Sequence, residues 1–435
     1  MDAQVLDAPV VLDLPRRASA VRGERFPRNI VVLALVAFPV LQPQLPGNMG
    51  PEDLLMGSAI LGVIFWAGTR QIPIHVPYGV PVAIMIVSGL VAAQFGIAPE
   101  AGALAAGQEI YLLGWAAALT TFARTPANVS LVLGAWTWGA VAWSTLLTVA
   151  VATHQWWLVG ASSADGARAQ LWFDNPNMAG NYFLVSFFIV LIGRHPRRPV
   201  PRAAACLIIL AALMLSGSNA ALLSLLIGLG ATGLLAVWRR VDLLNALAAA
   251  ALGVVLLAFA IVYVVDSNLT SDVAESSNVL VERSLARGGK SAEGRTSLFT
   301  EGVQLYRTGS LWGRGPASTK TTLDLGFTTS KVKEAHNDYL ATLVERGVLG
   351  ALGLLVFMAG VGIRAYGVAR RPMRPQYARV LSSPPAVFGV LLAMAFFAIT
   401  HEILHYRHAW AFFGLLAALH LHGLSGSALD ERVPA

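Results

Sequence analysis

Long apolar runs separated by short polar segments cover most of this 435-residue chain. A helix needs about 20 apolar residues to cross a bilayer, and about twelve runs approach that length. The predicted spans are 29–46, 53–69, 78–97, 104–123, 128–150, 178–194, 203–217, 219–238, 242–265, 338–366, 384–400 and 408–424. This pattern predicts an all-α polytopic membrane protein with about twelve transmembrane helices.

One polar segment interrupts the pattern for some seventy residues, from 266 to 336. A loop this long is usually functional or disordered. Apolar residues recur at helical spacing from Ser297 to Arg307, which predicts an amphipathic helix on the membrane surface with Arg295 at its start. We therefore expect a large functional loop between the ninth and tenth spans.

Composition and charge agree with a membrane protein. The chain is 56% hydrophobic and 13% charged, whereas soluble domains are about a quarter charged. The net charge of +7 is spread over the ends of the helices, so nucleic-acid binding is not expected. Cys206 is the only cysteine, which excludes an intramolecular disulfide. The oligomeric state stays open.

Lys and Arg are concentrated in alternate connections, as the positive-inside rule describes. This bias predicts that both termini are cytoplasmic and that the long loop faces outward. The expected organisation is a disordered cytoplasmic tail (1–28), nine spans (29–265), the outer loop (266–336), three spans (337–424) and a second tail (425–435).

The conspicuous polar groups lie on the predicted outer side. Arg168 precedes an Asn175-Pro176-Asn177 turn, in which Asn177 can cap the next helix, and a polar turn follows at 216–219. These residues fit either a binding site or an interfacial arginine and a capped hairpin.

His336, Asn337 and Asp338 stand where the tenth span begins. Asn337 or Asp338 can cap the helix, and an imidazole with a pKa of about 6.5 can accept a proton near neutral pH. A general base and a plain interfacial cap are the two interpretations of His336.

Residues 401–405, His-Glu-Ile-Leu-His, match the H-E-x-x-H pattern of zinc metalloproteases, provided that they are helical. Because the cation Arg407 follows directly, we favour contact of His401, His405 and Arg407 with an anionic lipid headgroup over a zinc site. A transporter is a third possibility, with Glu109 as the main charge within a span.

The spacing His336-Asn337, nine residues, then Gly347-Val-Leu-Gly350 resembles the H-N-x9-G-x-x-G signature of O-antigen ligases. Arg295, the turn Gly313-Arg-Gly315 and the 175–177 turn resemble the same family, over about residues 165–360. The chain departs from the family at Ala351, where ligases often have Thr, and at Asn219, where many relatives have Arg.

The resemblance implies transfer of a glycan from undecaprenyl diphosphate to lipid A–core at the periplasmic face of the bacterial inner membrane. His336 would be the general base, and Arg295 would bind the diphosphate, without a metal or another cofactor. The further residues expected to bind substrate are Arg168, Arg283, Arg287, Asn337, His405 and Arg407. O-antigen polymerases and protein O-oligosaccharyltransferases share these features, so the acceptor stays open.

Overall fold

The computed structural model describes residues 14–42, 49–96, 99–160, 168–173, 175–242, 244–245, 248, 288–319 and 336–425. Within these ranges the chain is helical, without a β-strand. The helices are α1 (Leu14–Val36), α2 (Pro51–Thr69), α3 (Gly79–Gln94), α4 (Pro99–Phe122), α5 (Pro126–Ala152), α6 (Trp156–Val159), α7 (Pro176–Ile192), α8 (Pro199–Leu215), α9 (Asn219–Trp238), α13 (Gly288–Arg307), α15 (Asp338–Arg370), α16 (Pro375–Ala378), α17 (Pro385–Phe397) and α18 (Arg407–Gly423).

Every predicted span within the described residues overlaps a helix, although the span predicted over 29–46 extends past the end of α1 at Val36. The span predicted over 242–265 lies mostly outside the described residues. By length and composition, α2, α5, α9 and α15 can each cross a membrane, and α3, α7, α8 and α17 are shorter apolar helices. The all-helical, apolar class is therefore confirmed, while the number of crossings stays a prediction.

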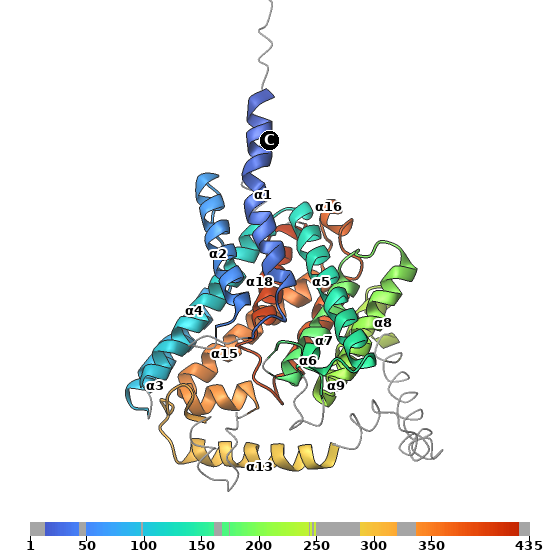
Figure 1. Ribbon diagram of the computed structural model, residues 1–435. Coiled ribbons are helices and arrows are strands. Elements are labelled where there is room, and N and C mark those ends of the chain that lie inside the picture. The colour runs from blue at the N-terminus through green and yellow to red at the C-terminus, as the bar shows by residue number, and fades with distance from the viewer. Residues whose placement is uncertain are drawn as a thin grey trace, which may run out of the picture.

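The helices form a bundle with α7 and α18 in its interior (Figure 1). The backbones of α18 and α4 approach closely at Gly414, where a Cβ atom would lie 2.6 Å from the Ala116 carbonyl oxygen. On the outer faces of α2 and α3, large apolar side chains such as Phe65 and Val80 are 73% exposed. Helices that are apolar on both their inner and outer faces are typical of a membrane bundle.

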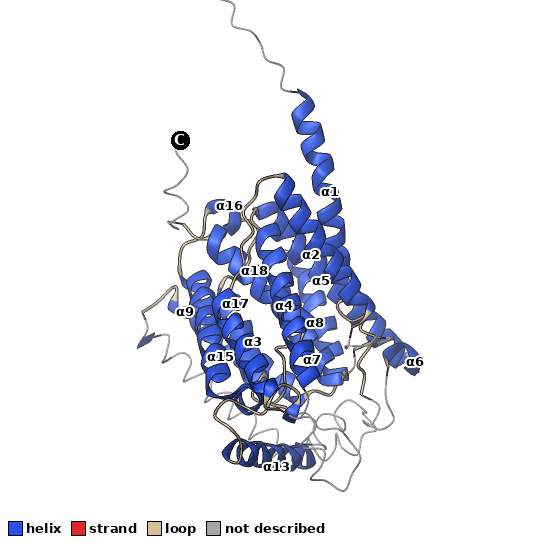
Figure 2. Cartoon of the chain, turned by 90° about the vertical axis from the view of Figure 1, so that its left-hand side faces the viewer, coloured by secondary structure: helices blue, strands red, loops and turns tan. Residues whose placement is uncertain are grey.

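The two ends of the bundle carry different elements (Figure 2). At the end that carries α16, which we call the basic end, Tyr377 donates a hydrogen bond to the Arg124 carbonyl and Arg194 Nε donates to Leu381 O at 3.0 Å. Helix α13 lies across the opposite end, which we call the α13 end. The arginine-rich connections that sequence assigned to one side thus meet at one end.

Two predicted boundaries were wrong. Helix α1 begins at Leu14, so the disordered tail predicted for 1–28 is helical from that residue, because its Arg, Ala and Leu residues favour helix. Helix α13 begins at Gly288, so Arg295 lies inside it rather than at its start. Apolar spacing located only the part of α13 that packs against the bundle.

Candidate active site at the α13 end

The His336–Asp338 segment forms a fixed corner at the start of α15. Asn337 caps the helix by accepting a hydrogen bond from the Leu340 amide at 2.9 Å. The Asp338 carboxylate accepts hydrogen bonds from the backbone amides of Ile403 at 2.8 Å and Leu404 at 3.4 Å. The corner is therefore tied to the connection between α17 and α18, and His336 precedes it with a positive φ of 50°.

His401 is the aromatic neighbour of His336. The two imidazole rings are 5.7 Å apart in an edge-to-face arrangement. The His401 ring is 2% exposed and stacks on Phe397 with centroids 4.5 Å apart. The buried ring of His401 thus forms one wall beside His336.

The zinc metalloprotease interpretation of residues 401–405 was wrong. That pattern places two histidines on one face of a helix, whereas 401–405 form an irregular connection between α17 and α18. His401 packs against Phe397, while His405 lines a separate cavity described below. Within the described ranges, no group of three His, Cys, Asp or Glu side chains could hold a metal ion.

The spacing between His336 and Gly347 has a structural reason. Helix α15 kinks at Gly347, which has a φ of 65°, and a Cβ atom there would lie 2.1 Å from Leu311 O. The segment Ser310–Thr319 packs against this kink, with Arg314 N donating to Val344 O and Gly315 N to Glu345 O, both at 2.9 Å. Gly347 therefore fixes the 310–319 segment of the long loop about three helical turns after His336.

Helix α13 lies against the first turns of α15. Gly302 abuts Leu340, and Leu298 packs with Ala341. Positions 295, 298 and 302 have the spacing of one helical stripe, so position 295 belongs to the stripe that faces α15. It lies about 10 Å along the helix from Gly302. Arg283 and Arg287 lie outside the described residues.

Arg168 connects two polar turns. Its Nε atom donates to Ser216 O at 2.9 Å, and a terminal nitrogen donates to Asn177 Oδ1 at 2.7 Å. The cap of α7 is Asn175 rather than the predicted Asn177, because the Asn175 side chain accepts from the Asn177 amide. Arg168 therefore braces the start of α7 against the turn at 216–219.

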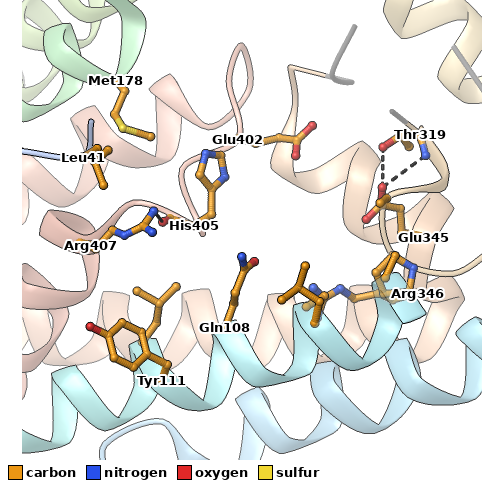
Figure 3. A pocket seen from close by; sticks show the side chains of 16 residues that line it. Leu41, Gln108, Tyr111, Met178, Thr319, Glu345, Arg346, Glu402, His405 and Arg407 are labelled. Carbon is orange, nitrogen blue, oxygen red and sulfur yellow. Dashed lines mark hydrogen bonds between the residues drawn. The ribbon is translucent and has the colours of Figure 1, made fainter. Parts of the chain in front are cut away.

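A cavity of about 450 Å³ opens at the same end of the bundle, beside the 401–405 connection (Figure 3). Arg407 lines it, and its guanidinium binds the buried Asp53 carboxylate in a bidentate manner, at 3.0 and 2.8 Å. Arg346 lines it from α15 and forms an ion pair with Glu109. The remaining lining residues are Leu41, Ala101, Leu104, Ala105, Gln108, Tyr111, Leu112, Met178, Pro316, Ala317, Thr319, Glu345, Glu402 and His405.

The geometry brings some of the predicted site residues together and leaves others apart. His336 and Asn337 share the α15 corner, while His405 and Arg407 lie one connection away in the cavity. In the described part of the chain, Arg168 donates hydrogen bonds to the 175–177 and 216–219 turns rather than to the α15 corner.

Sequence reasoning missed Asp53, Gln108 and Arg346. Asp53 begins a predicted span, and Gln108 and Arg346 lie inside predicted spans. A polar side chain within an apolar run needs a partner, and that was the signal.

Residues 204–357 match the family model described as O-antigen ligase. This match supports membership of the O-antigen ligase family. The match spans α8, α9, α13 and the first part of α15, so this ligase-family domain includes His336, Gly347 and position 295. No curated protein matches the chain. The match and the apolar helices support a glycosyltransferase-like membrane enzyme of the O-antigen ligase and polymerase kind.

Proposed function

We propose that this protein is an O-antigen ligase, which transfers a glycan from undecaprenyl diphosphate to lipid A–core oligosaccharide. The observation that carries the proposal is the family match over residues 204–357, which contains both the His336 corner and α13. In the proposed orientation the α13 end faces the periplasm and the basic end faces the cytoplasm of the bacterial inner membrane, across twelve spans.

The proposed reaction is a direct displacement. His336 takes the proton from an acceptor hydroxyl, whose oxygen forms a bond to the anomeric carbon of the donor glycan. The bond between that carbon and the diphosphate oxygen breaks, and undecaprenyl diphosphate leaves. Attack opposite the leaving group inverts the anomeric configuration.

Arginine residues are proposed to stabilise the charge that develops on the diphosphate. Position 295 supports this role because it lies on the stripe of α13 that faces α15, and Arg283 and Arg287 precede it in the same loop. A guanidinium can bind a phosphate through two hydrogen bonds, which an ammonium cannot do. Arg168 is better suited to positioning the 175–177 turn, because two of its nitrogens already bind protein oxygens.

Replacement of His336 by asparagine tests the proposal. This change removes the imidazole but retains a residue type that tolerates the positive φ of 50°. We expect glycan transfer to fall by about 100-fold or more, because general-base catalysis typically contributes that much. The assay uses purified protein in nanodiscs, lipid-linked glycan and lipid A–core, with product detected on the core.

His154→Asn is the matched control, because His154 is exposed and has a similar positive φ of 58°. It should transfer glycan at the wild-type rate. Unchanged transfer by the His336→Asn protein contradicts the role of the imidazole. Elongation of the glycan on its carrier lipid, without product on the core, identifies a polymerase, and product on a protein acceptor identifies an oligosaccharyltransferase.

A further inference from the structure

The cavity beside the 401–405 connection is separate from the His336 corner but adjoins it. Glu402 lines the cavity, and the preceding residue, His401, packs against His336. Figure 3 shows the Gln108 amide reaching from α4 toward the connection that carries Glu402 and His405. A ligand in this cavity would therefore lie near the proposed catalytic base.

The two arginines that line the cavity are neutralised by carboxylates of the protein. Asp53 occupies Nε and one terminal nitrogen of Arg407, and Glu109 pairs with Arg346. The side chains of both arginines are about 15% exposed or less. A bidentate carboxylate uses the same guanidinium edge that a phosphate would bind.

The described lining also holds two carboxyl groups that are not part of these ion pairs. Glu345 and Glu402 line the cavity, whereas Asp53 and Glu109 pair with its arginines. Part of Glu345 is engaged, because its carboxylate accepts hydrogen bonds from the Thr319 amide and hydroxyl. A diphosphate placed here would face carboxyl groups, beside arginines that already bind carboxylates, so its charge would be poorly compensated at low effective dielectric.

We propose that this cavity binds an uncharged, hydroxyl-rich sugar ring and excludes the diphosphate. The role of the cavity in glycan transfer rests on the proposed function. Carboxylates accept hydrogen bonds from sugar hydroxyls, and the Gln108 amide both donates and accepts them. Leu104, Tyr111 and Met178 provide apolar surface for the C–H faces of a ring. A volume of about 450 Å³ lies within the range of small-ligand sites.

The sugar has two sources, the glycan of the donor and the core of the acceptor, which share this chemistry. The primary test does not depend on transfer. Full-length protein in nanodiscs is mixed with a panel of neutral sugars, comprising glucose, galactose, N-acetylglucosamine and L-glycero-D-manno-heptose. Binding is followed by saturation-transfer difference NMR.

We expect at least one sugar to bind, and Gln108→Met to weaken that sugar's binding about tenfold, as for a lost hydrogen bond to a neutral partner. Glu402→Gln, which keeps the side-chain shape, should change the relative affinities within the panel. Gln94→Met is the matched control, since Gln94 is exposed at the end of α3. The control should bind as the wild type does.

Inorganic pyrophosphate tests whether the cavity excludes a diphosphate. It should not displace the bound sugar, and its own binding, followed by ³¹P NMR, should be unchanged in Gln108→Met. Displacement of the sugar by pyrophosphate overturns the proposal. The proposal is also overturned if no sugar of the panel binds, or if replacing Gln108 and Glu402 leaves the binding of every sugar unchanged.

Transfer kinetics then distinguish the two sources of the sugar. A raised KM for lipid A–core in Gln108→Met assigns the cavity to the acceptor, and a raised KM for the lipid-linked glycan assigns it to the donor. Sugar binding without any transfer by the wild type would refute the proposed function while leaving the sugar site intact.

Discussion

At the scale of single residues, Gly347 shows why one position of the family signature must be glycine. Its φ of 65° is unfavourable for a residue with a Cβ atom, and Leu311 O occupies the space where that atom would lie. The signature is therefore a packing requirement as well as a sequence pattern. It joins the 310–319 segment of the long loop to the helix that begins beside His336.

Gly347→Ala is expected to lower the free energy of unfolding by about 2–4 kcal/mol. The reasons are a strained backbone and an overpacked contact, each of which costs about 1–3 kcal/mol. Loss of helical circular dichroism during a sodium dodecyl sulfate titration measures the effect. Gly362→Ala adds the same methyl group to α15, where nothing lies within 4 Å, and should be neutral or slightly stabilising. Equal midpoints for the two variants would contradict this account.

At the scale of helices, the docking of α13 on α15 determines where position 295 lies. Gly302 allows the contact, because a Cβ atom there would lie 2.6 Å from a terminal carbon of Leu340. This contact lies only a few residues from His336 along α15. A displaced α13 would therefore move position 295 relative to the proposed base.

Gly302→Val should reduce glycan transfer by about tenfold or more, because small displacements of catalytic groups are costly, while leaving the bundle folded. Gln304→Val is the matched control, because Gln304 lies on the exposed face of α13. The measurement is initial rate at saturating donor and acceptor, beside the detergent midpoint of each protein. A Gly302→Val protein as active as its control would show that the contact of α13 with Leu340 is dispensable.

The helices and the His336 corner could be predicted from sequence, whereas the cavity could not. Apolar runs located the spans because burial and lipid exposure both require such residues. The cap at Asn337 followed from local chemistry at a helix start. The pairing of Asp53 with Arg407 joins positions 354 residues apart, and no local pattern encodes such a contact. For the same reason, the irregular shape of 401–405 overturned a motif that assumes a helix.

At the scale of the whole molecule, the separation of the basic end from the α13 end is the basis for the proposed orientation. The arginine-rich connections meet near α16, whereas α13 lies across the other end (Figure 2). The His336 corner belongs to the α13 end, because Gly302 of α13 contacts Leu340 in the first turn of α15. Because arginine-rich connections stay on the cytoplasmic side of a membrane, the basic end is predicted to be cytoplasmic and the α13 end periplasmic. The acceptor and the lipid-linked donor would then both reach the site from the outer leaflet.

Cysteine labelling tests this orientation directly. Cys206 is the only cysteine, so Cys206→Ala gives a background in which a single new thiol can be placed. Ser310→Cys lies at the α13 end and Gln376→Cys at the basic end, and both positions are exposed. In spheroplasts, a membrane-impermeant maleimide should label Ser310→Cys at once and Gln376→Cys only after lysis. Labelling of Gln376→Cys in intact spheroplasts, with Ser310→Cys protected, would reverse the orientation. The proposed base would then face the cytoplasm, which contradicts transfer at the periplasmic face.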